Sequence, residues 1–492
     1  MSPGERTPLW TRGGGLPPFL LPQDAETLVW PGCLEVPPRG SSEAVAPLSQ
    51  LPTGRDAVEP PRAGSQGSGP PDKRGLWAWI LFDFANSAFP TIIITALYVL
   101  YFKKVLVSDP RPGSGDWYWG LANSLGAFLV FLLAPALGFM ADSGGRKSRF
   151  LRRASFLCVG ATLGLGLLGP GDLGLGVLLL ILAILGFELA AVFYNAFLPE
   201  YAGSHSMARL SGLAWGLGYI GGLLSLLLCL PFLGEVQDLR YTAFLVAGWF
   251  LLFGLPTFLF VRDRDQSSPK LSLAASYKKL GQSLRRLSSL GDLPRFLAAF
   301  FFYNNGLLTV IVFAVAFTDQ SLGFSSRESL FLVLFLNLLA APGAIVLGRL
   351  ASHWGEKRTI SWTLLAWLLV VLLSYLLTRR ELLSLLMAKR AFWGVAALAA
   401  LCIGATQATS RALVGQLAPQ GQEGEYYGFM AFSGKASGVL GPLVFGLVSK
   451  LSGDQGLAIL SIGAFFLIGL LLLRGVAEPR SLDNPEVADP ER

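Results

Sequence analysis

The chain has few of the residues on which most enzyme and metal sites depend. Its 492 residues include only two histidines, His205 and His353, and four cysteines. The cysteines are spread widely and show neither metal-ligand spacing nor a disulfide framework, so those inside apolar runs are interpreted as buried bystanders. We therefore expect no metal, no cofactor and no enzymatic centre built on these residue types.

Charged residues are also scarce. They make up 14% of the chain, whereas a soluble domain has about 25%. Apolar residues reach 52% and the mean hydropathy is +0.54. The net charge of +7 does not indicate a nucleic-acid partner, because basic residues of membrane proteins collect in the cytoplasmic loops.

Long apolar runs are abundant instead. We count twelve between Leu76 and Val476, and each has about the 20 residues that cross a bilayer as a helix. Backbone groups in lipid must bond within their own segment, which favours helices over open strands. The sequence therefore predicts an all-α integral membrane protein with twelve transmembrane helices. In approximate bounds the runs are 77–102, 118–141, 154–170, 173–198, 209–233, 241–261, 295–318, 328–351, 359–378, 391–416, 427–450 and 455–475.

The runs fall into two halves of six, 76–261 and 294–476, joined by a linker at 262–293. A tail at 1–75, rich in Pro, Gly and Ser, is predicted to be disordered because it cannot bury enough apolar surface. It is either a regulatory tail or an artefact of an early start codon. A short polar tail, 477–492, ends the chain.

The linker itself carries a helical pattern. Its apolar residues from Leu273 to Leu287 are spaced by three and four, and Lys278, Lys279 and Arg285 lie off that stripe. This pattern predicts a basic amphipathic helix on the membrane surface. The alternative is an ordinary solvated linker.

Lys and Arg residues in the loops predict the orientation. More of them lie on the side of the N-terminus and of the linker than on the other side. By the positive-inside rule that side is cytoplasmic. An even number of spans then places both termini in the cytoplasm. Short loops favour a plasma (inner) membrane carrier, or a vacuolar or other endomembrane carrier if the source is eukaryotic.

A loop is repeated in the two halves. Segment 138–147, which follows the second run, shares Gly, Ala, Gly and Lys with segment 348–357, and each pair is 210 residues apart. Two six-helix halves with this loop resemble the major facilitator superfamily, whose substrate site lies between the halves near the midplane. The resemblance implies a cytoplasmic gate in which Asp142 and Arg146 make charge contacts, next to Lys147. The second copy has Ser352 in place of the Asp.

Polar side chains inside the apolar runs are the candidate site residues, because such groups are costly in lipid and mark functional cavities. Most lie on the first, fourth, seventh and tenth runs, which line the central cavity in that superfamily. Asp83 and Glu188 are candidate proton carriers, and Arg411 and Lys435 are candidate ligands of a carboxylate. The alternative is that Asp83–Arg411 and Glu188–Lys435 are structural ion pairs. The full set is Asp83, Asn86, Glu188, Asn195, Asn304, Asn305, Gln407, Arg411 and Lys435.

Whole motifs give a narrower resemblance. Asp-Phe-Ala-Asn-Ser-Ala at 83–88, Phe-Tyr-Asn-Ala at 193–196, Tyr-Asn-Asn-Gly at 303–306 and Gln-Ala-Thr-Ser-Arg at 407–411 occur in this order. They resemble the vacuole effluxer family, the autophagy-related amino-acid exporters and their bacterial relatives. The resemblance implies efflux of neutral amino acids such as leucine, isoleucine or tyrosine, driven by protons. We expect the protein to be a monomer.

One position departs from that family, whose seventh helix usually reads Asn-Asp-Gly. Here Asn304-Asn305-Gly306 replaces the acid, and an amide carries no proton, so coupling would fall to Asp83 or Glu188. Other classes stay open. These are a lipid or lysolipid carrier and a non-transporting receptor or scaffold of the same fold, with Asn86 and Asn195 capping helix breaks instead of lining a site.

Overall fold

The computed structural model describes residues 73–107, 114–143, 145–263, 272–285, 291–379 and 384–477. Twelve helices in these ranges are long and apolar enough to cross a membrane, which confirms the predicted all-α membrane fold. Residues 1–72, for which disorder was predicted, and residues 478–492 of the polar tail lie outside the described residues. The chain is a multi-pass membrane protein.

The helices follow one another with short connections. The first span, Lys73–Leu106, is built from several segments, the fourth, Leu173–Tyr201, joins α5 and α6, and the sixth, Val236–Phe260, joins a short 3₁₀ turn to α8. The helices are α1 (Lys73–Asn86), α2 (Tyr98–Tyr101), α3 (Ser114–Asp142), α4 (Lys147–Leu167), α5 (Leu173–Asn195), α6 (Leu198–Tyr201), α7 (Met207–Leu228), α8 (Tyr241–Phe260), α9 (Leu273–Arg285), α10 (Leu293–Leu322), α11 (Ser326–Trp354), α12 (Glu356–Thr378), α13 (Leu385–Leu417), α14 (Glu423–Ser452) and α15 (Gln455–Arg474).

Some predicted boundaries were wrong. The third span was expected from residue 154 but begins at Lys147, because its first two turns carry basic residues that apolarity alone does not assign to a span. The α1 helix begins at Lys73, before the boundary expected at residue 76. Within the linker range, α9 covers Leu273–Arg285 and contacts α3.

The first span changes its helical type where the predicted site begins. The α1 helix ends at Asn86, and Phe89–Ala96 forms a π-helical segment with Pro90 in its first turn. Proline has no N–H and clashes with the preceding turn, and Ser87 Oγ donates to the Asp83 carbonyl oxygen at 2.7 Å. Short π-helical segments occur frequently at functional sites.

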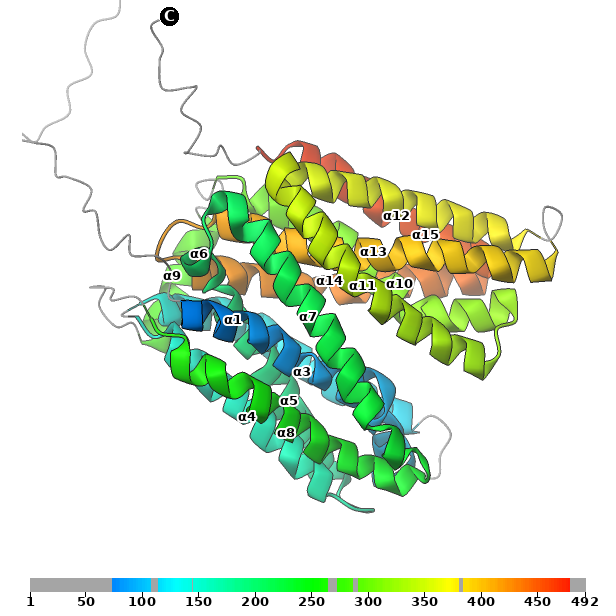
Figure 1. Ribbon diagram of the computed structural model, residues 1–492, viewed down its shortest axis with the longest axis horizontal. Helices are drawn as coiled ribbons and strands as arrows, with labels where there is room; N and C mark the ends of the chain where they lie inside the picture. The colour runs from blue at the N-terminus through cyan, green and yellow to red at the C-terminus, as the bar shows by residue number, and fades with distance from the viewer. Residues whose placement is uncertain are drawn as a thin grey trace, which may run out of the picture. The chain divides into compact units, whose positions relative to one another are not determined.

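The spans pack as two sets, coloured blue to green and green to red in Figure 1. We call α1, α3, α4, α5, α7 and α8, with the rest of the first span, the first six spans. We call α10 to α15 the last six spans. Within the first set α4 packs on α5 and α8, and α1 packs on α7 and α8. Within the last set α10 packs on α14 and α15, and α12 packs on α13 and α15.

Contacts between the two sets run along two seams. The α3 helix packs on α14, and α7 packs on α11 and α13. Glycine permits the close approach at both seams. A Cβ on Gly138 would lie 2.1 Å from the Gly424 carbonyl oxygen, and a Cβ on Gly348 would lie 2.8 Å from the Ala208 carbonyl oxygen.

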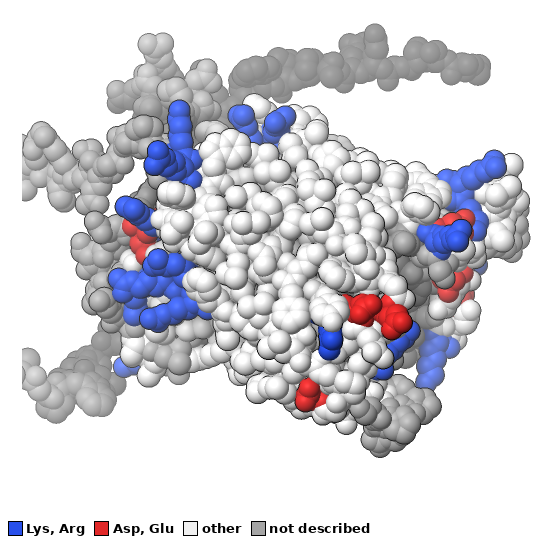
Figure 2. Space-filling model, turned by 60° about the horizontal axis from the view of Figure 1, so that its bottom comes forward, with Lys and Arg blue, Asp and Glu red and all other residues white. Residues whose placement is uncertain are grey.

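The outer surface is suited to lipid. Figure 2 shows a broad uncharged band between two ends that carry the Lys, Arg, Asp and Glu residues of that face. Large apolar side chains point outward from many helices, among them Leu252, Phe331, Trp362 and Leu443, each more than 60% exposed. Exposed apolar area on this scale is the mark of a surface that contacts a membrane.

Candidate functional site

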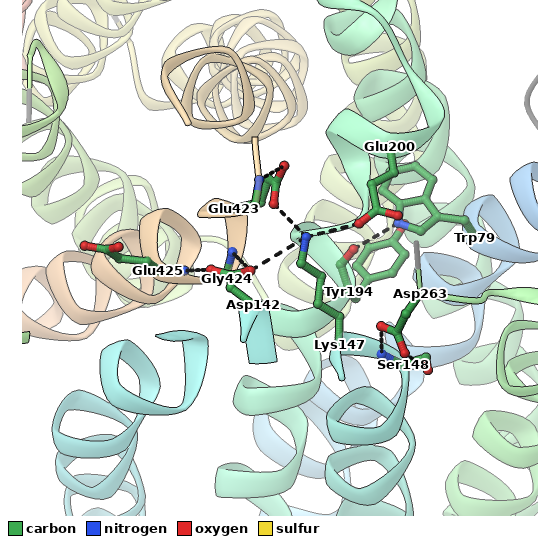
Figure 3. A network of polar contacts seen from close by, with 11 residues as sticks. Trp79, Asp142, Lys147, Ser148, Tyr194, Glu200, Asp263, Glu423, Gly424 and Glu425 are labelled. Carbon is green, nitrogen blue, oxygen red and sulfur yellow. Dashed lines mark hydrogen bonds and ion pairs between the residues drawn. The ribbon is translucent and has the colours of Figure 1, made fainter. Parts of the chain in front are cut away.

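One end of the bundle is closed by a charged contact between the two sets of spans. We call this end, where α3 ends and α4 and α14 begin, the latch end. Asp142, the last residue of α3, accepts hydrogen bonds from the backbone N–H groups of Gly424 and Glu425, both at 2.9 Å (Figure 3). The first N–H groups of a helix have no partner within it and carry positive partial charge. Asp142 therefore fastens the first six spans to the start of α14.

Lys147, the first residue of α4, is the centre of the same contact. Its Nζ lies 2.6 Å from Glu423 Oε2, 3.1 Å from Glu200 Oε1 and 3.6 Å from Asp142 Oδ1 (Figure 3). The lysine side chain is 3% exposed. Removing one member of a buried charge cluster leaves its partners uncompensated, so loss of any one member is expected to weaken the closed arrangement.

Arg146 lies beside this cluster but contacts its own turn. Its Nε donates to the Ser143 carbonyl oxygen at 3.1 Å, and its Nη2 donates to the Met140 carbonyl oxygen at 3.0 Å. The sequence analysis expected charge contacts from Asp142 and Arg146 next to Lys147, and the structure places Lys147 beside Asp142 and Glu423. The reason is the left-handed turn at Gly145 (φ 58°), which turns the chain back so that Lys147 faces α14.

A second contact between the sets is buried deeper in the bundle. Arg411 on α13 donates through Nη1 to Asp83 Oδ2 on α1 at 2.7 Å. Its Nε and Nη2 donate to the hydroxyl and carbonyl oxygens of Ser211 on α7, both at 2.8 Å. Asn195 Oδ1, at the end of α5, accepts from Nη1 at 3.4 Å. The structure thus brings three predicted site residues, Asp83, Asn195 and Arg411, together.

Aromatic rings complete the surroundings of Arg411. Its Cζ lies 5.4 Å from the ring centroid of Trp79, and 5.6 Å from those of Tyr194 and Trp215. Such cation–π contacts add to the ion pair when water is excluded. The Arg411 side chain is only 3% exposed and that of Asp83 12%, so this pair is part of the closure between the sets.

Glu188 on α5 and Lys435 on α14 form a third contact between the sets, an ion pair from Lys435 Nζ to Glu188 Oε1. Their side chains are 22% and 27% exposed, respectively. Both ion pairs that the sequence analysis left as structural alternatives are therefore formed. They differ in exposure, since the side chains of Glu188 and Lys435 have more accessible surface than those of Asp83 and Arg411.

The amides on α10 are bound within the last six spans. Asn304 Nδ2 donates to Ser437 Oγ at 2.5 Å. Asn305 is fully buried, its Nδ2 donates to the Phe301 carbonyl oxygen at 2.8 Å, and its Oδ1 accepts from the Gly441 N–H at 2.9 Å. Since Gly441 precedes a proline inside α14, Asn305 binds the backbone at that proline, which differs from the cavity-lining position predicted for it.

The remaining two predicted amides lie near the break in the first span and at the α7–α13 seam. Gln407 Oε1 accepts from Tyr219 Oη of α7 at 2.6 Å, which links the two sets. Asn86 is buried at the last residue of α1. Asn195 is likewise the last residue of α5, and its side chain contacts Arg411.

Several residues of these contacts were not predicted as site residues. Glu423 belongs to a loop in the sequence, and Glu200 follows the fourth apolar run, so neither stood out as a costly charge in lipid. Ser211 and Tyr219 resemble ordinary helix residues. The short Pro-Glu-Tyr segment of α6 was the one signal for Glu200, because an acid at a helix end beside a basic loop favours pairing.

The opposite end holds a separate polar hollow of about 640 Å³, lined by Gln320, Thr378, Arg379 and Asp454 among others. Asp454 caps α15 and pairs with Arg379 at 2.5 Å. Burial raises the pKa of Asp454, but hydrogen bonds from Arg379 and from the backbone of α15 outweigh it and hold that pKa below its ordinary value. This hollow contains none of the predicted site residues.

Solved structures show the fold of the protein. The structure matches the human organic anion transporter MFSD10 (TETRAN) with a TM-score of 0.63, at 19% identity, over 82% of this chain and 100% of that one. Similarity at this identity shows the fold alone. Together with the twelve spans in two sets and a similar match to a proton:xylose symporter of the major facilitator superfamily, it shows the fold of that superfamily.

Sequence comparison gives the family. The family model described as "Vacuole effluxer Atg22 like" matches residues 118–208 and 201–485, and the chain belongs to this family. It is 28% identical over 420 residues to YxiO of Bacillus subtilis (strain 168), named an uncharacterized MFS-type transporter, which covers 82% of this chain and 95% of that protein.

Fungal relatives are more distant and longer. Autophagy-related protein 22-1 of Penicillium rubens is 25% identical over 290 residues, which is 54% of this chain and 48% of that protein. The chain therefore spans about half the length of such fungal relatives.

Proposed function

We propose that this transporter exports neutral amino acids by alternating access, with protons as the coupling ion. The observation that carries the proposal is the placement of Asp83 and Glu188 in the first six spans and their partners Arg411 and Lys435 in the last six. A substrate held between two sets of spans must be released when the sets rock. Acidic and basic groups from opposite sets suit a solute that carries both charges.

The proposed moving units are the halves 76–261 and 294–476, joined by the linker at 262–293. In the described arrangement the latch end is closed by Asp142 and Lys147. We propose that this end faces the cytoplasm, that both termini lie there, and that the protein works as a monomer in the plasma membrane. The basic residues at the start of α4, Arg149, Arg152 and Arg153 among them, support this orientation.

The coupling proposal depends on the two acids. Each faces a cation from the other set, so protonation of the acid would weaken a contact between the sets and favour their separation. Asn305 lacks a titratable group and is bound to the α14 backbone, so it takes no part in the proposed coupling. If neither acid titrates, the same site would support facilitated diffusion.

The test is flux of leucine, isoleucine and tyrosine in proteoliposomes, with and without an imposed pH gradient. We expect gradient-driven flux that Asp83→Asn lowers by about tenfold or more, because Arg411 then lacks its buried counter-ion. Glu328→Gln is the matched control, since Glu328 pairs with Lys389 away from the proposed site. Absence of flux for every amino acid, in folded protein, would refute the substrate class and favour a lipid carrier or scaffold.

A further inference from the structure

The Glu188–Lys435 pair lies near mid-depth, between the two sets of spans. Lys435 is twelve residues into α14, about 18 Å from its first residue at 1.5 Å per residue. A bilayer core is about 30 Å thick. Arg411 is only six residues from the end of α13, about 9 Å from the latch end on the same scale. The Glu188–Lys435 pair is therefore the deeper of the two, when depth is counted from the latch end.

Helix faces show that both side chains point across the seam. Residues seven apart lie on one face of a helix, and Asn195, seven residues after Glu188, contacts Arg411 of the other set. On α14, Gly428 is seven residues before Lys435 and packs on α3, where a Cβ would lie 2.8 Å from the Ala134 carbonyl oxygen. Each side chain thus reaches toward the opposite set.

The pair stands where close packing ends. One turn nearer the latch end, Phe432 of α14 stacks on Phe131 of α3 with centroids 4.1 Å apart. At Glu188 and Lys435 the side chains are 22% and 27% exposed, compared with 3% for Lys147 and Arg411. Both charges therefore keep accessible surface in the arrangement in which the latch is closed.

We propose that Glu188 and Lys435 bind the two charged groups of a zwitterionic solute, and we call this pair of residues the headgroup site. When no solute is bound, the two side chains pair with each other. The ammonium group of the solute pairs with Glu188, and its carboxylate pairs with Lys435. This inference rests on the proposed amino-acid transport and names the residues that recognise the backbone of the substrate.

Charge balance is the physical reason for the selectivity. A zwitterion replaces one neutral pair by two neutral pairs, so each charge keeps a counter-ion. A solute with one charge would take one partner and leave the other partly buried and uncompensated, which is strongly unfavourable. The resident ion pair therefore rejects simple amines and simple carboxylates, and a site built for two polar groups discriminates strongly against an analogue that lacks one.

The experiment compares three probes of one carbon skeleton on the full-length protein by isothermal titration. They are L-leucine, 3-methylbutylamine, which lacks the carboxylate, and 4-methylpentanoate, which lacks the ammonium group. In the unmodified protein we expect both analogues to bind at least about tenfold more weakly than leucine, because each leaves one charge unpaired.

Replacing either charged residue by a neutral one should weaken leucine binding and strengthen binding of one analogue, and the favoured analogue should differ between the two variants. Glu188→Gln frees Lys435, so leucine binding should weaken about 10- to 100-fold while 4-methylpentanoate binding strengthens. Lys435→Gln frees Glu188, so 3-methylbutylamine binding should strengthen instead. The double variant should bind all three probes weakly and within about threefold of one another. Glu328→Gln and Lys389→Gln, which break a half-exposed pair elsewhere, should leave the order of the probes unchanged.

Two outcomes would overturn the inference. One is that the unmodified protein binds the analogues as tightly as leucine. The other is that the two single variants weaken leucine binding without changing the ratio of the analogues, as a purely structural ion pair would. If leucine is bound and transported but the single variants leave the ratio of the two analogue affinities unchanged, only the headgroup site is refuted and the proposed amino-acid transport stands. If no amino acid is bound or transported, the proposed function fails with it.

Discussion

The repeated loop, 138–147 in the first six spans and 348–357 in the last six, shares two glycines with special roles in the backbone but differs in its chemistry. Gly145 (φ 58°) and Gly355 (φ 93°) both have a positive φ, which favours glycine. Gly138 and Gly348 both lie where a helix of the other set crosses at close range. The two copies therefore support equivalent seams, α3 with α14 and α11 with α7.

The charges of the two copies behave differently. In the first copy Asp142 and Lys147 contact the other set directly. In the second copy Ser352 Oγ donates to the Arg349 carbonyl oxygen of its own turn, and Lys357 Nζ donates to the Arg474 carbonyl oxygen within its own set at 3.0 Å. Both seams thus share the close packing at glycine, whereas the charged contacts of the latch described above join α3 and α4 to α14. Release of the latch end is expected to begin at α3 and α14.

The largest effect is expected from Asp142→Asn, with Ser352→Ala as the matched change in the second copy. Asp142 accepts two charge-assisted hydrogen bonds, each contributing about 1.5–3 kcal/mol. Loss of about 3 kcal/mol would shift the closed-to-open ratio about 100-fold. The measurement is alkylation of a cysteine introduced at Ala408, which is fully buried, in protein without native cysteines.

Asp142→Asn should make that cysteine react much faster, and Ser352→Ala should leave its rate unchanged. Ala408 suits this measurement because its carbonyl oxygen accepts from Ser211 Oγ across the α7–α13 seam at 2.6 Å. Equal rates in both variants would contradict the one-sided latch. The two seams would then contribute alike to closure.

A smaller effect is expected from the glycines at the two seams. In Gly138→Ala the new Cβ would lie 2.1 Å from a backbone oxygen of α14, which cannot move alone, whereas in Gly348→Ala the nearest atom is 2.8 Å away. Overpacking costs about 1–3 kcal/mol, so both variants should melt at a lower temperature than the unmodified protein in a thermal-denaturation assay. Gly138→Ala should melt lower, and the reverse order would show that the α11–α7 seam is the tighter one.

The sequence was sufficient for the spans because apolar length is a local property, read within about 20 residues. The candidate pairs Asp83–Arg411 and Glu188–Lys435 were also accessible, since charges inside apolar runs are rare enough to be matched. Both pairs are formed in the structure.

The sequence did not allow us to predict which residues contact one another at the latch. Lys147 and Glu423 are 276 residues apart, and Glu423 is one acid among several in a polar loop. Whether Arg146 or Lys147 faces α14 depends on the turn at Gly145, which adds a rotation that composition does not show. The role of Asn305 was not predictable either, because the hydrogen bond that its Oδ1 accepts from the Gly441 N–H depends on how α14 packs against α10.

The smallest effect is expected from Ser352→Asp, which would give the second copy the acid that the first copy has. The new carboxylate would lie on the α11–α7 seam, near the start of α7, where helix N-termini favour negative charge by about 0.3–1 kcal/mol. Flux should slow about two- to fivefold because closure at both seams must then be released. Ser352→Asn is the neutral control and should not slow flux. If Ser352→Asp has no effect while Asp142→Asn opens the latch end, then the sequence repeat supplies the seam but not the geometry of the latch, and the position of the α14 N-terminus is what makes Asp142 effective.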